Sequence, residues 1–379
     1  MVTASVLANA HIVLADEIIF GSIRINDGRI DAISSGAARA ADDLEGDYLI
    51  PGLVELHTDH LESHYHPRPG VEWPAEPAVI AHDAQIAATG ITTVFDALRA
   101  GSFDPGDVSA GNGEKLCAAI HAVQAAGSLR AEHHIHLRCE LPCADTVEAA
   151  ERTLAAGDVR LISVMDHTPG VRQFVSIEKF KEYYLGKKLV LPEKIDAYIA
   201  EKQALQSAHS AYNKRGILDL ASRFGIRLAS HDDATVEHID EAVADGVVIA
   251  EFPTTDEACQ AAHLHGLAVM MGAPNVVRGG SHSGNISAQA VAASGQLDIL
   301  SSDYVPSSLL MAAFALPQMI DFITLPQALA FVTVNPARVA GLGDRGDIAT
   351  GKRADLVQVS VRTGMPVVRR VWRNGIRVL

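Results

Sequence analysis

Cysteine is scarce in this chain of 379 residues. The four cysteines form no CxxC pair and stand at positions 117, 139, 143 and 259. So few cysteines in a chain of this length do not make a disulfide framework. We therefore expect buried, reduced thiols.

Long apolar runs and a secretion signal are also missing. No stretch of about 18 apolar residues occurs, so no helix is expected to span a membrane. The first twenty residues are largely apolar but lack a basic region, and His11, Asp16 and Glu17 interrupt them. Such a segment is a poor signal peptide, and we expect a cytoplasmic protein.

Basic residues are fewer than acidic residues. The chain has 31 Lys and Arg against 46 Asp and Glu, which gives a formal net charge of −15. This charge argues against non-specific binding to nucleic acid and against docking to an anionic membrane. No GxGxxG or GxxxxGK[ST] motif opens a helix, which disfavours a nucleotide-binding α/β fold.

Histidine is abundant, with 17 residues in a chain of globular composition. Histidine is the commonest metal ligand in proteins. Histidines that the fold brings together are therefore candidate metal ligands.

The middle of the chain alternates between apolar, β-branched runs and alanine-rich helical stretches. This alternation is typical of βαβ units around a parallel sheet. Eight strands fit a (β/α)8 barrel, and a doubly wound open sheet is the alternative. The eight runs are YLIPGLVELH, GITTVFDAL, HHIHLRCEL, LISVMDH, IRLASHD, VVIAEFP, LAVMMG and LDILSSD.

Both ends of the chain are rich in short strands instead. Asn26-Asp27-Gly28 predicts one hairpin turn, and Asn374-Gly375 predicts another. We expect one small β-sandwich domain from residues 1–50 and 341–379, and the barrel from residues 51–340. A long, charged, helical stretch at about 174–216 is predicted to be an insertion in the barrel.

Five of the predicted strands end in His or a carboxylate. In a (β/α)8 barrel the carboxyl ends of the strands carry the active site. Several buried carboxylates require a counter-charge, which a divalent metal supplies. The residues at the five ends are His57-Thr58-Asp59-His60, Glu140, Asp166-His167, His231-Asp232-Asp233 and Asp303.

Imidazole and carboxylate ligands together suit borderline divalent ions such as Zn, Mn, Fe or Co. His57 and Asp59 are two apart on a strand, so both side chains point the same way and one ion can take both. A carboxylate such as Glu140 can bridge two ions, and Asp303 would then accept the proton of a bridging water.

The same residues carry a family resemblance over essentially the whole chain. PGLVELHTDHLE followed by GITTVFDAL resembles the opening of the barrel in the amidohydrolase superfamily, and GDIATGKRADLVQVS resembles its return to the β-sandwich. Within that superfamily the chain resembles the phosphonate-metabolism PhnM family. The segments that carry this similarity are HTDHLESHYHPRPGVEWP, HHIHLRCELP, VMDHTPGVRQF, SHDDAT, GAPNVVRGGSHSGNIS and SSDYVPSSLL.

The resemblance implies a hydrolase with two divalent metal ions, Zn, Mn or Fe. It implies hydrolysis of α-D-ribose 1-methylphosphonate 5-triphosphate to diphosphate and the 5-phosphate, ahead of carbon–phosphorus lyase. The ligands it implies are His57 and Asp59 for one ion, Glu140 as a bridge, His167 and His231 for the other ion, and Asp303 as ligand and catalytic base.

A triphosphate is a polyanion, and the acidic net charge does not exclude it because affinity depends on local charge. Arginine binds phosphate bidentately, and a glycine-rich loop lets backbone N–H groups approach phosphate oxygens. The expected substrate-binding residues, all in loops after barrel strands, are Arg68, Arg172, Arg278, Ser281 and His282.

Other polar residues near these strand ends favour a structural role. Asp232 and Asp233 are expected either to orient His231 or to cap the next helix, and capping is the favoured interpretation. The alternating histidines at positions 133, 134 and 136 are interpreted as packing residues of their strand.

Two other functions fit the same residues. An amidohydrolase acting on a C–N bond, such as a cyclic amide or an N-acyl amino acid, would use the same fold and metal ligands. It would have no need of three separated arginines, however. The other is a non-catalytic scaffold subunit of a phosphonate-processing assembly. The expected partner is the small phosphorylated ribose phosphonate, without nucleic acid or membrane, and homo-oligomerisation is left open.

Overall fold

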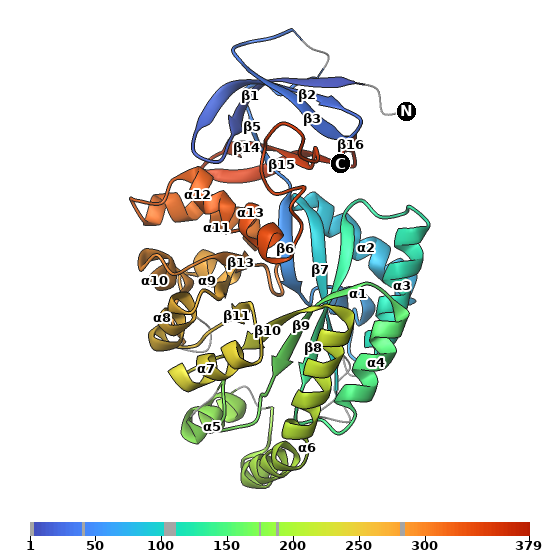
Figure 1. The fold of residues 1–379 in the computed structure, drawn as a ribbon, viewed down its shortest axis with the longest axis vertical. Coiled ribbons are helices and arrows are strands. Elements are labelled where there is room, and N and C mark those ends of the chain that lie inside the picture. The colour runs from blue at the N-terminus through green and yellow to red at the C-terminus, as the bar shows by residue number, and fades with distance from the viewer. Residues whose placement is uncertain (1–3, 40–41, 102–110, 174–175, 187–188, 281–284) are drawn as a thin grey trace.

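The computed structural model describes residues 4–379 except 40–41, 102–110, 174–175, 187–188 and 281–284. Its named strands form two separate eight-stranded sheets. Figure 1 shows a smaller sheet, built from both ends of the chain, above a larger sheet that helices surround. The expected fold class, a barrel with a β-domain made from both termini, is confirmed.

The larger sheet is parallel and follows chain order from β6 to β13. A bridge between Thr58 and Asp303 joins its two edges and nearly closes it into a barrel. Each strand overlaps one of the eight predicted runs, and β6, β7, β8 and β9 extend one or two residues beyond theirs. The bounds are β6 (Leu53–Thr58), β7 (Ile91–Ala100), β8 (Glu132–Glu140), β9 (Val159–Met165), β10 (Arg227–His231), β11 (Ile249–Glu251), β12 (Ala268–Gly272) and β13 (Ile299–Ser301).

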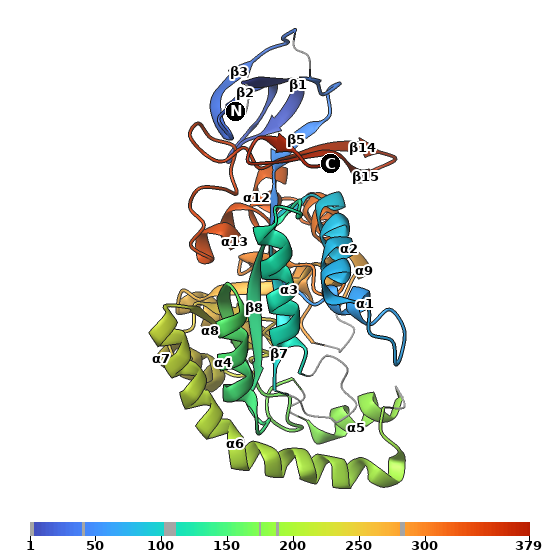
Figure 2. The same ribbon diagram turned by 90° about the vertical axis from the view of Figure 1, so that its right-hand side faces the viewer.

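Helices alternate with these strands and cover the outside of the barrel (Figures 1 and 2). The alanine-rich sequences allow close packing: in α8, Ala258, Ala261 and Ala262 are buried at helical spacing. The bounds are α1 (Leu61–Tyr65), α2 (Ala75–Ala88), α3 (Gly113–Ala125), α4 (Thr146–Ala156), α7 (Val236–Ala244), α8 (Asp256–Leu264), α9 (Ala273–Arg278), α10 (Ala288–Ala293), α11 (Ser308–Met319), α12 (Leu325–Ala330) and α13 (Val334–Val339).

The smaller sheet has the order β16-β15-β14-β5-β1-β2-β3, with β4 beside β1. It curls so that β1, β2 and β3 lie over β5, β14 and β15 (Figure 2). Ile12 and Ile23 from the start of the chain share one apolar core with Leu356 and Trp372 from its end. The bounds are β1 (Ser5–Val13), β2 (Ile18–Asn26), β3 (Arg29–Ser35), β4 (Asp42–Asp43), β5 (Tyr48–Pro51), β14 (Leu356–Arg362), β15 (Met365–Arg373) and β16 (Ile376–Arg377).

Both predicted hairpin turns are present in this sheet. Asp27 and Gly28 have φ of 48° and 75°, and Asn374 and Gly375 have φ of 51° and 73°. Two successive residues with positive φ define the turn that matches the twist of a two-stranded hairpin, which explains the Asn, Asp and Gly at these positions.

The predicted insertion is helical, and its second helix is longer than the sequence pattern suggested. It consists of α5 (Ile177–Gly186), a short 3-10 turn at Pro192–Lys194, and α6 (Ile195–Phe224). The 30 residues of α6 also provide the barrel helix that leads into β10. Figure 2 shows α5 and the first half of α6 across the end of the barrel that lies opposite the small sheet. Because β6 starts beside that sheet, this is the end where the strands finish.

Two further expectations concern the chain as a whole. All four cysteines are buried and free, as the sequence predicted. Among the described residues, the structure contains no helix with the length and apolar character needed to cross a bilayer.

Candidate metal centre

The inward positions of the barrel strands change from apolar to polar toward their carboxyl ends. On β10 the buried Ala229 is followed two residues later by His231, and on β11 Ile249 is followed by Glu251. Residues two apart on a strand face the same side. Ala229 and Ile249 belong to an apolar plug with side chains from five other barrel strands. The polar side chains therefore lie just beyond this plug.

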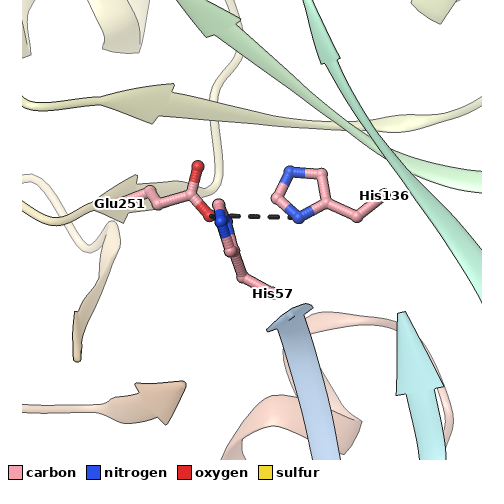
Figure 3. Close-up of side chains that lie close together, drawn as sticks. All are labelled: His57, His136 and Glu251. Atoms are coloured by element: carbon pink, nitrogen blue, oxygen red, sulfur yellow. Dashed lines mark hydrogen bonds and ion pairs between the residues drawn. The ribbon is translucent and has the colours of Figure 1, made fainter. Parts of the chain in front are cut away.

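The most deeply buried pair of the centre is His57 on β6 and Glu251 on β11. Oε1 of Glu251 lies 2.5 Å from Nδ1 of His57 and 3.9 Å from Nδ1 of His136 (Figure 3). Its Oε2 accepts a hydrogen bond from the Ser163 hydroxyl at 2.6 Å. Burial opposes ionisation of Glu251, but the neighbouring imidazoles outweigh it and hold its pKa well below the usual range. With Nδ1 committed to Glu251, Nε2 of His57 is the nitrogen left for a metal.

His136, beside this pair, has both ring nitrogens engaged. Nδ1 lies 2.8 Å from the carbonyl oxygen of Leu56, and Nε2 contacts the hydroxyl of Ser163. Burial lowers the pKa of His136 to about 3, so the ring stays neutral. This arrangement supports the packing interpretation of His136.

A second group combines His167, His231 and Asp232, which follow β9 and β10. One donor atom from each lies within 4.8 Å of the others. Oδ2 of Asp232 is 3.6 Å from Nε2 of His167 and 3.1 Å from Nδ1 of His231. Nε2 of His231 is also 3.9 Å from Oε2 of Glu251. The two groups are therefore adjacent and share one end of the barrel.

Glu140 holds His167 in place. Its Oε1 accepts a hydrogen bond from the His167 backbone N–H at 2.9 Å, and its Oε2 lies 2.5 Å from the ring Nδ1. Burial works against ionisation, but His167 lowers the pKa of Glu140 to about 2. Both oxygens thus serve to orient His167, and the bridging role stays a prediction.

Asp303 lies at the edge of the centre beside Asp59. The Asp303 backbone N–H donates to the carbonyl of His57 at 3.1 Å, and the Asp59 N–H donates to the carbonyl of Asp303 at 3.3 Å. Burial, and then the charge of Asp59, raise the pKa of Asp303. A guanidinium nitrogen of Arg138 lies 3.8 Å from Oδ2 of Asp59. The predicted pair of His57 and Asp59 is thus close to Asp303, although Asp59 belongs to neither group of convergent donors.

Strained backbone accompanies these residues. Asp232, Phe252 and Asp303 have φ of 56°, 53° and 53°, which L-residues rarely adopt outside functional sites. The Phe252 ring packs 5.1 Å from the ring of His57 and 5.6 Å from that of His231. The strained turn after β11 thus places an apolar ring against both imidazoles.

The donors fit divalent metal ions. Nε2 of His231 and Oδ2 of Asp232 are buried and make no aligned hydrogen bond among the described residues, although Oδ2 of Asp232 lies 3.1 Å from Nδ1 of His231. Leaving such atoms unsatisfied costs free energy, and a bound cation satisfies both. Imidazole nitrogen with carboxylate oxygen is a donor set for Zn, Mn or Fe. His57 could hold one ion, and His167, His231 and Asp232 could hold another.

A cavity of about 240 Å³ opens directly onto this centre. Four of the six predicted metal ligands line it, namely His57, His167, His231 and Asp303. Arg138 and Arg278 provide positive charge on its wall, while Asn275 and Asn285 provide neutral amides. A reacting group in this cavity would therefore meet imidazole, carboxylate and guanidinium groups together.

The structure places Arg68 and Arg172, two other predicted substrate-binding residues, outside the lining of this cavity. The Arg172 guanidinium pairs with the buried carboxylate of Asp233 and, at 3.0 Å, with Glu241. Arg68 is exposed in the loop after α1, and neither Arg68 nor Arg172 lines the cavity. Ser281 and His282 lie outside the described residues. Among the described members of this set, Arg278 lines the cavity.

The capping interpretation of Asp232 and Asp233 is wrong. Thr235 caps α7, since its side chain accepts a hydrogen bond from the backbone N–H of His238. Asp232 instead faces His231, and Asp233 pairs with Arg172 while accepting a hydrogen bond from Ser230.

Sequence reasoning also missed residues that shape the centre. Glu251 ends β11 within the run VVIAEFP, so the same strand-end rule that selected His231 could have found it. Arg138 lies two residues before Glu140 on β8 and faces the same side. Glu55 is fully buried and accepts hydrogen bonds from the backbone N–H groups of His57 and Ser302, both at 2.6 Å. Burial raises the pKa of Glu55 to about 7.

Comparison with known proteins agrees with this geometry. The amidohydrolase family model matches residues 48–378. The chain is 47% identical to the alpha-D-ribose 1-methylphosphonate 5-triphosphate diphosphatase of Escherichia coli K12, over 98% of this chain and 100% of that one. It is 26% identical to an adenine deaminase of Nitratidesulfovibrio vulgaris, over 98% of this chain and 56% of that one.

Solved structures show the same fold. The N-acetyl-D-glucosamine-6-phosphate deacetylase of Mycobacterium smegmatis superposes with a TM-score of 0.62 at 18% identity, over 99% of this chain and 100% of that one. The match of the family model and the 47% identity over the full length show that the chain belongs to the amidohydrolase family, within the same branch as the Escherichia coli diphosphatase.

Proposed function

We propose that this protein hydrolyses α-D-ribose 1-methylphosphonate 5-triphosphate, releasing diphosphate and leaving the 5-phosphate. The observation that carries the proposal is a buried His and carboxylate centre that opens onto a cavity walled by Arg138 and Arg278. The full-length similarity to the Escherichia coli diphosphatase supports the same substrate.

Two divalent ions, drawn from Zn, Mn or Fe, are proposed to bind at this centre. The nitrogen donors would be His57 for one ion and His167 and His231 for the other. Asp232 and the predicted ligands Asp59, Glu140 and Asp303 surround these positions. When bound, the ions would stabilise charge on the attacked phosphate and favour ionisation of water.

Asp303 is the proposed proton acceptor. It lines the cavity, and its raised pKa brings its basicity closer to that of a working general base. The new bond forms between phosphorus and the oxygen of water. The bond that breaks joins phosphorus to the oxygen of diphosphate, which leaves with the electron pair.

Arg138 and Arg278 would bind anionic oxygens of the phosphorylated substrate. Guanidinium groups suit this role because they stay charged and bind phosphate bidentately. Phe252 and Met271 line the same cavity and exclude water from its floor.

Hydrolysis of a C–N bond is the second candidate, because the fold and the metal donors fit it equally well. Arg138 and Arg278 on the cavity wall favour hydrolysis of a phosphoanhydride over hydrolysis of a C–N bond. A set of buried donors that faces a cavity also favours an enzyme over a scaffold subunit.

Product analysis separates the two reactions. The metal-loaded protein is incubated with the ribose methylphosphonate triphosphate, and phosphorus NMR follows diphosphate and the 5-phosphate. Parallel reactions with a cyclic amide and an N-acyl amino acid are assayed for amine or ammonia. We expect equimolar diphosphate and 5-phosphate. Amine release without diphosphate would instead establish the C–N hydrolase.

The remaining expectations belong to the same proposal. The β-sandwich domain comprises residues 1–50 and 341–379, and the barrel domain comprises residues 51–340. The protein acts in the cytoplasm without nucleic acid or membrane, and size-exclusion chromatography decides whether it forms a homo-oligomer.

A further inference from the structure

A second cavity, of about 300 Å³, adjoins the first at the metal centre. Arg138, His167 and Gln173 line both cavities. The outer wall of the second cavity comes from α5 and α6, which cross the carboxyl end of the barrel (Figure 2). A single ligand extending over the metal centre could therefore occupy both cavities.

The second cavity is strongly cationic. Arg99 on β7, Arg138 on β8 and Lys202 on α6 line it. Glu140 is the one carboxylate among the described lining residues, and it is already engaged by His167. Lys202 is only 4% exposed, so its ammonium group belongs to the cavity wall and not to the outer surface. Three cationic side chains around one space fit a ligand with several negative charges.

Aromatic side chains give this cavity its wall. The rings of Phe180 and Tyr184 stack at 4.0 Å with an interplanar angle of 26°, and Tyr198 lines the same cavity. Nζ of Lys202 lies 5.0 Å from the centre of the Tyr198 ring. The rings fix the position of the ammonium, and tyrosine hydroxyls are hydrogen-bond donors to anionic oxygens.

The first cavity has a different character. Besides Arg138, which lines both cavities, Arg278 is the one arginine among the described residues that line the first cavity. Asn275 and Asn285 lie beside apolar side chains such as Met271. Neutral amides and apolar surface suit sugar hydroxyls and one singly charged group better than a chain of phosphates.

From these contrasts we propose that the second cavity is the subsite for the two terminal phosphates, which leave as diphosphate. The first cavity would hold the ribose and its methylphosphonate, and the anhydride to be cleaved would lie between them beside Arg138 and His167. This assignment rests on the proposed function. It makes the helical insertion, through Tyr198 and Lys202, the element that selects a polyphosphate.

Product inhibition tests the assignment. Inhibition constants are measured for inorganic diphosphate and for the ribose methylphosphonate 5-phosphate, at one fixed metal concentration, on the wild type and on Lys202→Met and Arg99→Met. Arg223→Met is the control, because Arg223 is exposed on the same helix as Lys202 and lies outside both cavities.

We expect the constant for diphosphate to rise about 10- to 100-fold in both cavity variants, the loss typical of a hydrogen bond to a charged group. The constant for the 5-phosphate should change less than about threefold, which also shows that the variants fold. Arg223→Met should match the wild type.

Two results would overturn the subsite. One is an unchanged constant for diphosphate, and the other is a loss confined to the 5-phosphate, which would reverse the two cavities. Failure of the proposed function is seen separately, because the wild type would then release no diphosphate from the triphosphate.

Discussion

Oε1 of Glu251 and Nδ1 of His57 lie 2.5 Å apart inside the barrel, although the residues are 194 positions apart in the chain. A carboxylate that accepts the ring N–H of a histidine fixes its tautomer and raises its basicity as a ligand. The same relationship recurs between Glu140 and His167. Two buried carboxylates thus present two imidazoles to the cavity.

Removing the charge of Glu251 should weaken the centre while preserving its shape. For Glu251→Gln we expect metal affinity and kcat/KM to fall about 10- to 100-fold, as is typical when the partner of a ligating histidine is lost. Metal titration and the diphosphate assay measure the two quantities. Glu257→Gln, at an exposed position of α8, is the matched control. Equal metal affinity in the two variants would refute this role of Glu251.

Asp303→Asn should stop turnover while metal is retained. Loss of a general base lowers kcat by about 10²- to 10⁴-fold, and atomic emission reports the metal content. In the wild type only ionised Asp303 accepts a proton, so kcat/KM should rise as pH increases through a pKa above the ordinary 3.8. This rise of kcat/KM at acidic pH should be absent in Asp303→Asn. Full activity of Asp303→Asn would remove Asp303 from the mechanism.

Arg172→Met distinguishes a structural arginine from a substrate ligand. Asp233 is fully buried, and even with Arg172 beside it burial raises the pKa of Asp233 to about 6. Losing the guanidinium should cost about 3 kcal/mol of unfolding free energy, measured by urea denaturation. KM for the triphosphate should stay within about threefold. A tenfold rise in KM with unchanged stability would restore the phosphate contact predicted from the sequence.

His133 should make the folded state sensitive to alkali. Its ring lies 2.7 Å from Asp96 and 3.4 Å from Asp83, and these carboxylates outweigh burial and raise the pKa of His133 to about 9. In the unfolded chain the pKa is near 6.5. The folded state therefore keeps a proton that the unfolded state loses between these values, so stability is complete below pH 6.5 and declines through pH 9.

Urea denaturation at pH 6.5 and pH 9 tests this linkage. We expect the wild type to lose up to about 3 kcal/mol, at about 1.36 kcal/mol per pKa unit, and His133→Gln to show a smaller loss. Identical pH dependence in both proteins would exclude His133 as its source.

Sequence alone predicted the barrel and much of the centre because both depend on periodic patterns. Apolar runs mark the strands, and polar residues at their ends mark the open face, so His57, His167, His231 and Asp303 were found. Glu251 also lies at the end of a barrel strand, but that strand, β11, has only three residues. A single glutamate there gave a weaker signal than a histidine.

The partners of charged side chains could not be predicted in the same way. Arg172 lies in a loop after a barrel strand, as a phosphate ligand would, yet it pairs with Asp233, 61 residues later. Lys202 belongs to the long, charged stretch predicted to be an insertion, and its spacing does not mark it as buried, yet it is only 4% exposed. Such pairings depend on tertiary distances that residue spacing does not encode.

The proposed centre uses divalent metal to hydrolyse a phosphoanhydride. The most direct test is diphosphate release from the ribose methylphosphonate triphosphate before chelation, after exhaustive chelation, and after Zn, Mn or Fe is restored. We predict that release falls at least about 100-fold without metal and returns with one of the three ions. Undiminished diphosphate release by the metal-free protein would contradict a role of metal in the reaction. No diphosphate release from the metal-loaded protein would contradict hydrolysis of this phosphoanhydride.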